Sequence, residues 1–125
     1  MQQANHQYLV DILHAAQRIL EYTDNTTLHS FYEDVQLQDK VVRKLLTIGK
    51  TAQRTSAATR QEVGGVNWPQ LTKMKERLLQ NEPVIDADQV WTIAQSEIPT
   101  LANVISDTVV SNEADAALFS QSVSV

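Results

Sequence analysis

Apolar residues recur at helical spacing along the first part of the chain. Between about residues 4 and 23 they form two neighbouring stripes on one predicted helix. The stripes consist of Tyr8, Ile12, Ala15 and Ile19, and of Leu9, Leu13, Ala16 and Leu20. Two adjacent stripes make an apolar face wider than one neighbouring helix usually covers. We therefore expect this helix to pack into a bundle and also to face a second surface, for which another subunit is a candidate.

The same period returns in a second long helix, predicted from about residue 38 to residue 62. A turn precedes it, in which Thr27 is a candidate N-cap for a short helix that places Phe31 and Tyr32 in the core. Glycine inside a helix costs about 1 kcal/mol relative to alanine, so Gly49 predicts the close approach of another helix. The buried stripe of the long helix is predicted to contain Val41, Leu45, Ile48 and Ala52.

Prolines set the boundaries of the next predicted helix, which follows a loop opened by a glycine pair. Either Asn67 or Trp68 caps this helix, because Pro69 fits the first turn, where a missing N–H costs nothing. The helix ends by about Glu82, because Pro83 cannot continue it. Its apolar positions are Leu71, Met74, Leu78 and Leu79.

A last helix is predicted to begin after Asp86, whose side chain can cap it, and Pro99 must kink or split it. Beyond about Val110 the chain becomes polar and is expected to fray, with Leu118 and Phe119 as candidates for docking onto the bundle. One apolar face of the helix is predicted to contain Trp91, Ala94, Ile98, Leu101, Ile105 and Val109.

Together these elements predict an all-α protein with one domain. Residues 1–110 form an antiparallel bundle of about four to five helices, and residues 111–125 form a flexible C-terminal tail. The 125 residues contain no cysteine, which excludes disulfides and thiolate metal sites. No signal peptide is suggested, and no apolar stretch approaches the ~18 residues that a membrane span needs. We expect a soluble cytoplasmic protein without a metal ion or cofactor.

Charge divides the chain more sharply than its net value of −5 indicates. Nine of the ten basic residues lie between positions 40 and 77, where the acidic residues are Glu62 and Glu76. This division predicts one electropositive surface for phosphate or an acidic partner, or else basic helices that pair with acidic ones or face water. The candidate anion-binding residues are Arg43, Lys50, Arg54, Lys73 and Arg77. The first three share one helical face without interleaved acids, so local pairing is not expected.

Four phrases in this sequence resemble the HepT-like family of HEPN-domain proteins. They span residues 11–23, 38–49, 67–86 and 90–101, within a resemblance that covers about residues 8–108. The resemblance implies a homodimeric helical bundle and metal-independent RNA cleavage, as in the toxin half of a toxin–antitoxin pair. It also implies an MNT-type nucleotidyltransferase partner that adds AMP to a motif tyrosine. The family favours acidic residues where this chain has Leu46 and Lys50, which makes that face more basic here.

The family's chemical motif is an arginine, a histidine and a tyrosine, and this chain departs from it at each position. Lys75 replaces the arginine that would clamp a phosphate with its planar fork. Gln80 replaces the histidine that would transfer a proton, a step that contributes about 10²–10⁴-fold to the rate. Glu82 replaces the tyrosine that would accept AMP. Trp68 and Asp86 remain in register with the family.

Two functional hypotheses follow from this combination of scaffold and motif. In the first, the chain has lost ribonuclease activity and acts as a binding or regulatory partner of a nucleotidyltransferase or of RNA. In the second, it is an active ribonuclease with a relocated catalytic set of Lys75, Arg77 and Glu82. His14, with Asp11 three residues before it, is a further candidate for a polarised imidazole, although surface histidines are far commoner.

Overall fold

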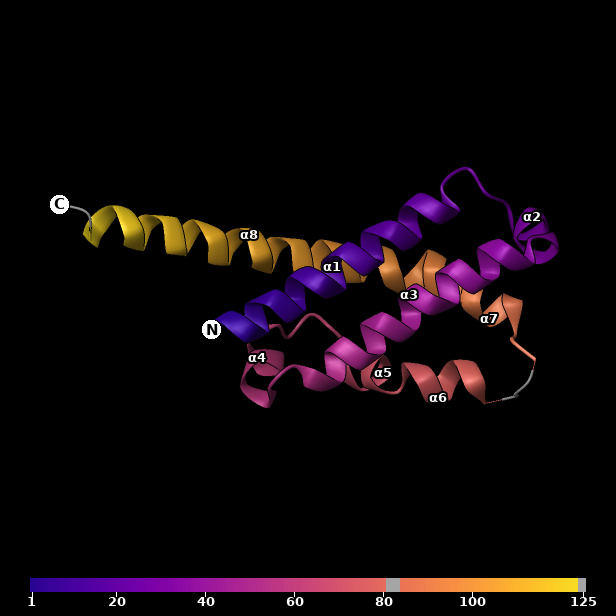
Figure 1. The fold of residues 1–125 in the computed structure, drawn as a ribbon, viewed down its shortest axis with the longest axis horizontal. Helices are drawn as coiled ribbons and strands as arrows, with labels where there is room; N and C mark the ends of the chain where they lie inside the picture. Colours follow the sequence, from indigo (N-terminus) through magenta and orange to yellow (C-terminus); the bar gives the residue numbers. More distant parts are fainter. Residues whose placement is uncertain (81–83, 124–125) are drawn as a thin grey trace.

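The computed structural model describes residues 1–80 and 84–123, with side chains through residue 118, and its regular structure there is helical (Figure 1). This confirms the predicted all-α bundle. In the described part of the chain, no helix is long and apolar enough to cross a membrane. The long helices are α1 (Gln3–Thr23), α3 (Val35–Arg54) and α8 (Ile98–Val123). The short ones are α2 (Leu28–Glu33), α4 (Ala57–Glu62), α5 (Trp68–Thr72), α6 (Met74–Leu79), α7 (Ala87–Thr92) and the π-helical turn η1 (Ile93–Glu97).

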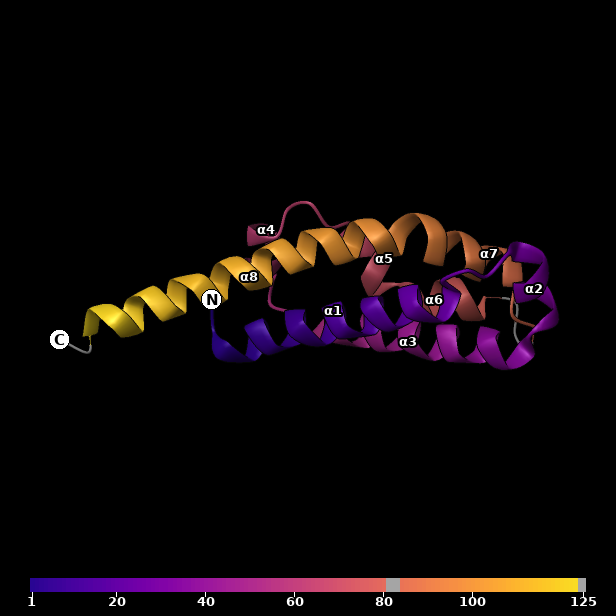
Figure 2. The same cartoon turned by 90° about the horizontal axis from the view of Figure 1, so that it is seen from above.

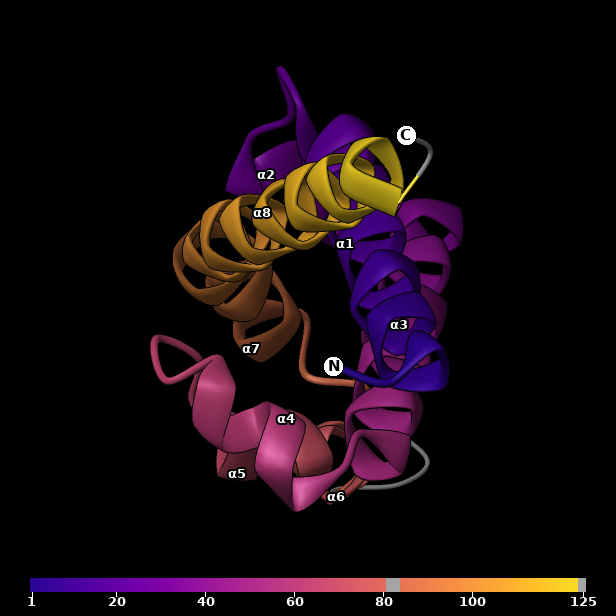
Figure 3. The same cartoon turned by 90° about the vertical axis from the view of Figure 1, so that its left-hand side faces the viewer.

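Helix α1 lies between α3 and α8 and packs against both (Figure 3). Leu9, Ile12 and Ile19, taken from its two apolar stripes, are all fully buried. The wide apolar face is therefore covered by two helices of the same chain. The width of α1 gives no argument for a contact with another subunit, contrary to the expectation from the sequence.

The predicted helix over residues 38–62 is wrong in its extent, because the chain breaks after α3. Thr55 has an extended backbone, and the Ser56 side chain then caps α4 by accepting a hydrogen bond from the Thr59 N–H. The Ser56 N–H donates to Asn5 Oδ1 of α1 at 2.8 Å. The break is thus held by a buried asparagine from a distant part of the sequence, which the local pattern could not predict.

The helix predicted after Asn67 is also interrupted, because α5 and α6 meet at Lys73. Both pack against α3 beside Gly49. A Cβ atom at Gly49 would lie 2.8 Å from Met74 Cβ and 3.0 Å from the Leu71 carbonyl oxygen. The close approach predicted at this glycine is confirmed. Asn67 caps α5 by accepting from the Gln70 N–H.

Pro99 interrupts the last predicted helix, as expected. Proline has no N–H, and its ring would clash with the carbonyl group four residues before it. Just before Pro99 the helix becomes the wider π-helical turn η1, and the Ile98 N–H donates to the Ile93 carbonyl oxygen. Before this turn, Asp86 caps α7 as predicted, accepting from the Gln89 N–H at 3.3 Å.

The two aromatic residues predicted as core behave differently. Phe31 is fully buried and lies 5.2 Å from the partly buried Trp91 between ring centroids. Tyr32 is 49% exposed, so its assignment to the core is wrong. Its hydroxyl donates to an Asp88 carboxylate oxygen at 2.7 Å, and this hydrogen bond raises the pKa of Tyr32.

Helix α8 continues past Val110 to Val123 and projects beyond the rest of the bundle (Figures 1 and 2). The sequence predicted a frayed tail from residue 111, but the structure has a helix there. Alanine is frequent and glycine and proline are absent in this stretch, which favours a helix. The first turn of α1 contacts it through Glu113, which lies 3.8 Å from His6. Leu118 is 62% exposed, and the Phe119 side chain lies outside the described residues.

Candidate functional site

The residues at the family's motif positions lie on and just after α6. Lys75 and Gln80 are exposed, with Gln80 at the C-terminal cap position of the helix. Among the described residues, neither side chain has a hydrogen-bond or ion-pair partner. Glu82 lies outside the described residues. The structure thus brings an ammonium group and an amide to the motif helix, and the amide cannot serve as a general acid or base near neutral pH.

Arg77, on the same helix, is bound inside the molecule. Its guanidinium group donates to both carboxylate oxygens of Glu97 in η1, at 3.1 and 2.6 Å. It also donates to the Gln70 carbonyl oxygen at 3.3 Å. Both side chains of the pair are about three-quarters buried, with 24% and 27% of their surfaces exposed. The carboxylate partner of Arg77 is thus Glu97, and Arg77 joins α5 and α6 to η1.

The basic residues of α3 fall into two groups. Arg43 pairs with Asp39 one turn earlier at 3.0 Å, so the expectation that it lacks a local partner is wrong. Lys50 and Arg54 are exposed, and no ion pair engages them within the described chain. The five predicted anion-binding residues therefore differ in their surroundings. Arg43 and Arg77 have carboxylate partners, and Lys73 lies exposed at the junction of α5 and α6.

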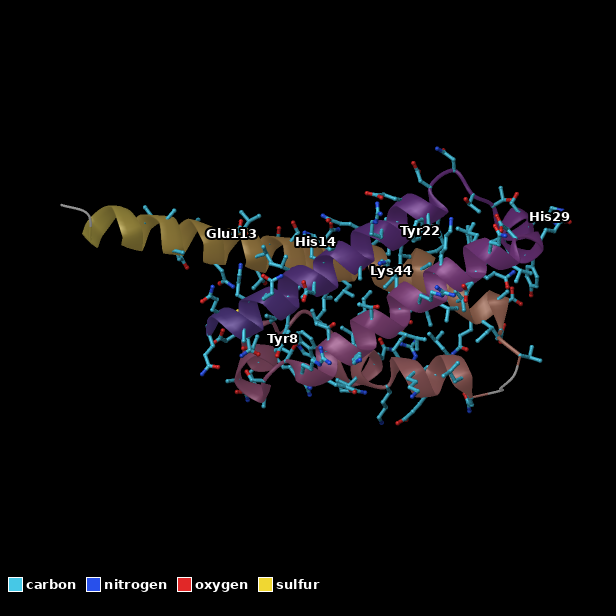
Figure 4. The ribbon with its side chains drawn as sticks, viewed as in Figure 1. Tyr8, His14, Tyr22, His29, Lys44 and Glu113 are labelled. Carbon is cyan, nitrogen blue, oxygen red and sulfur yellow. The ribbon has the colours of Figure 1, made fainter. Side chains whose placement is uncertain are left out.

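Lys50 and Arg54 line a groove of about 720 Å³ formed by α1 and α3, hereafter the α1/α3 groove. Figure 4 shows His14 on α1 and Lys44 on the neighbouring α3. The α1 side contributes Asp11, His14, Ala15, Gln17, Arg18 and Glu21, and the α3 side contributes Lys44, Thr47, Lys50, Thr51 and Arg54. Four of these residues are basic and two are acidic, so the groove is electropositive although the whole chain is acidic.

Both acidic residues of the groove already have partners on their own helix. Glu21 accepts a hydrogen bond from Arg18 at 3.1 Å, and Asp11 accepts from Gln7 Nε2 at 2.9 Å. At one end of the groove, the guanidinium carbon of Arg18 lies 5.9 Å from the centroid of the Tyr22 ring. The ammonium nitrogen of Lys40 lies 5.8 Å from the same centroid. The acids therefore do not neutralise the lysine and arginine side chains on α3.

The three histidines lie away from the motif helix. His14 lines the α1/α3 groove, His6 faces Glu113, and His29 lies 3.3 Å from Glu33 in an exposed pair. Within the described residues, no group of three or more histidine, aspartate and glutamate side chains is placed to hold a metal ion. His14 is thus the imidazole that lies beside basic residues.

The family model described as "Ribonuclease HepT-like" matches residues 12–108 of this chain. The chain belongs to the ribonuclease HepT-like family. This match confirms the resemblance to HepT-like HEPN-domain proteins that four short phrases of the sequence indicate.

Individual family members are similar to this chain over most of its length. A Thermococcus cleftensis protein named "Probable ribonuclease HepT" is 25% identical over 101 residues, covering 81% of this chain and 92% of that protein. A Methanocaldococcus jannaschii protein named "Gamma-glutamylcyclotransferase and putative RNase" is 28% identical over 98 residues. The match covers 78% of this chain but 44% of that longer protein. No solved structure matches.

The sequence missed several residues that the structure places in the two regions. Glu97 is twenty positions from Arg77 in the sequence and lies in the π-helical turn η1. Arg18 and Lys44 complete the groove, but Arg18 lies outside the basic block and Lys44 has no distinctive spacing.

Proposed function

We propose that this HepT-like protein has lost ribonuclease activity and acts by binding, as the regulatory partner of a nucleotidyltransferase-type protein or of RNA. The observation that carries the proposal is the set of residues at the motif positions, Lys75, Gln80 and Glu82. A metal-independent ribonuclease needs a group that exchanges a proton near neutral pH, and an amide cannot do so. Glu82 also has no phenol to accept AMP.

The fate of Arg77 supports the same proposal. A phosphate clamp needs a guanidinium fork that is free to take two oxygens of the substrate. In this chain, that fork is occupied by the Glu97 carboxylate in a partly buried pair. Releasing Arg77 for a phosphate would leave Glu97 without its partner, which opposes a catalytic role.

The second candidate is an active ribonuclease with a relocated catalytic set. Lys75 is exposed and could reach a substrate, and His14 lines a basic groove. Histidine is the side chain used most often for general acid–base catalysis, and His14 lies in this groove beside basic side chains. These two observations keep this candidate open to direct test.

Cleavage assays with tRNA and mRNA at high protein concentration separate the two candidates. We expect no cleavage by the unaltered chain. Cleavage that is abolished by Lys75→Ala, Glu82→Ala or His14→Ala would overturn the proposal and identify the relocated set. As a positive control, the triple variant Lys75→Arg, Gln80→His, Glu82→Tyr restores the family's motif residues and reports whether the scaffold can still support cleavage.

The proposed partners are tested by assembly. We expect a homodimer, as the resemblance implies, which light scattering of the purified chain measures as a mass near twice 14.0 kDa. Co-expression with a nucleotidyltransferase encoded beside this chain should yield a stable complex. A monomer that binds neither this protein nor RNA would contradict the binding role.

A further inference from the structure

The α1/α3 groove has a row of cations that the motif-based hypotheses do not use. We propose that this groove binds the phosphate backbone of single-stranded nucleic acid, irrespective of its sugar, through Lys44, Lys50 and Arg54. The proposal deepens the proposed function, because it gives a protein without a cleavage motif a separate surface for holding a strand. It assigns binding to α1 and α3 rather than to Lys75 and Gln80 on α6.

The length of the row favours a chain of phosphates over a single anion. Lys44 and Arg54 are ten residues apart on α3, which corresponds to about 15 Å along the helix axis. Lys50 lies between them and lines the same groove. One compact anion cannot occupy both ends of such a row at once, whereas neighbouring phosphates of an extended strand can.

The composition of the groove favours phosphate over an acidic protein. Ala15 is the apolar residue among the side chains that line it, and the others are polar or charged. A stable protein interface usually has an apolar centre surrounded by a polar rim, and this groove offers no such centre. Contacts to a nucleic-acid backbone, in contrast, come from lysine, arginine and polar side chains such as Gln17.

The charges in the groove are available to a ligand. Lys50 and Arg54 are exposed and have no ion-pair partner within the described chain, while Glu21 is held by Arg18. The rest of the molecule repels polyanions, since the chain carries a net charge of −5. Any affinity for a phosphate chain must therefore come from a local surface, which mutation can locate.

The test measures binding without cleavage, by fluorescence anisotropy of a labelled 2′-O-methyl oligouridylate that has no free 2′-hydroxyl. The variant Lys50→Glu/Arg54→Glu alters two exposed groove residues. The matched control, Lys73→Glu/Lys75→Glu, makes the same change of charge at α6 and its junction with α5. We expect the groove variant to bind at least about tenfold more weakly at low salt, and the control to differ by less than about threefold.

Salt dependence gives a second readout. The logarithm of affinity falls with the logarithm of salt concentration by about 0.7 per phosphate contact in single strands. Lys50→Ala/Arg54→Ala should therefore make this slope shallower by about 1.4. Circular dichroism of each variant verifies that the helices are intact, so weaker binding cannot be assigned to unfolding.

Three competitors identify the ligand chemistry. Oligothymidylate should compete as well as the oligouridylate, because the backbone and not the sugar is bound. Polyglutamate should compete poorly, and equal competition by it would overturn the assignment to phosphate. Inorganic polyphosphate that binds the groove when neither oligonucleotide does would overturn the assignment to nucleic acid.

Different results would contradict the proposed binding groove and the proposed loss of ribonuclease activity. Equal loss of binding in the groove variant and the α6 control, or no loss in either, would overturn the groove alone. Cleavage of ordinary RNA by the unaltered chain would overturn the proposed loss of activity, but would leave the groove assignment intact if the groove variant still lost affinity for the uncleavable strand.

Discussion

Two regions of this molecule contain basic side chains, and these side chains have different roles in each region. At α6, the Arg77 guanidinium is partly buried and paired with Glu97, where it holds short helices together. In the α1/α3 groove, Lys50 and Arg54 are exposed and face solvent without an ion-pair partner in the described chain. The two regions differ because the fold places Glu97, which is distant in the sequence, beside Arg77. Among the described residues, no acidic side chain forms an ion pair with Lys50 or Arg54. Positive charge in a sequence therefore predicts a binding surface only after these internal partners are known.

We expect the largest effect on stability from a substitution that disrupts the close contact of α3 with α5 and α6. Gly49→Val places branched carbons where the glycine Cβ position is already 2.8 Å from Met74 Cβ. We expect the free energy of unfolding to fall by about 3 kcal/mol, the upper part of the range for overpacking. Urea denaturation followed by circular dichroism measures this. Gly49→Ala is the milder control, because its gain of about 1 kcal/mol in helix propensity offsets part of the clash. An unchanged stability in the valine variant would contradict the close contact.

Removing one charge from each region tests the comparison directly. Arg77→Ala should lower the free energy of unfolding by about 2 kcal/mol, because it deletes charged hydrogen bonds and leaves Glu97 partly buried without its partner. Lys50→Ala should change stability by less than about 0.5 kcal/mol, as expected for an exposed side chain. Equal effects in the two variants would show that the regions do not differ as described.

The Arg77–Glu97 pair also predicts a dependence on salt that sharpens the contrast. Surface pairs such as Arg43–Asp39 contribute about 0.5 kcal/mol or less and are screened by salt. Arg43→Ala should therefore destabilise the protein only slightly at low ionic strength and not measurably at 1 M NaCl. The loss in Arg77→Ala should persist at high salt, because the pair is about three-quarters buried. Thermal denaturation at two salt concentrations measures both.

The smallest expected effect concerns Tyr32, which belongs to neither region. Its pKa is raised by the hydrogen bond to Asp88, with smaller contributions from burial and from the charges of Asp88 and Asp86. A raised pKa means that the stabilisation is fully present below the ordinary tyrosine pKa of about 10 and is lost as the pH rises through the folded value. The melting temperature of Tyr32→Phe should be slightly lower than that of the unaltered chain at pH 8, and the difference should vanish at strongly alkaline pH.

Much of the fold could be predicted from local pattern. The long helices follow their apolar period, and the effects of Gly49 and Pro99 follow from backbone chemistry. The break after α3 could not be predicted, because it depends on Asn5 of α1 reaching Ser56. The tail was misassigned for another reason, since its polarity was taken as a sign of fraying while its alanines favour a helix.

The candidate site was less accessible from sequence. The motif positions could be identified from the sequence, because all three departures from the family's motif lie within eight consecutive residues. The five basic residues chosen from the charged block include two that the fold neutralises, Arg43 with Asp39 and Arg77 with Glu97. The α1/α3 groove could not be predicted from the sequence, because it forms where α1 packs against α3. One of its basic residues, Arg18, also lies outside the charged block. Side chains that meet across helices carry no local signature.

The π-helical turn before Pro99 links a backbone constraint to the charge pattern. By adding a residue to one turn, it rotates the polypeptide so that Ile98 enters the interior while Glu97 reaches Arg77. The counter-ion of Arg77 thus lies in the same turn that accommodates a proline twenty-two positions after the arginine. We therefore expect Pro99→Ala to change the hydrogen bonding of η1, and with it the contact between Glu97 and Arg77.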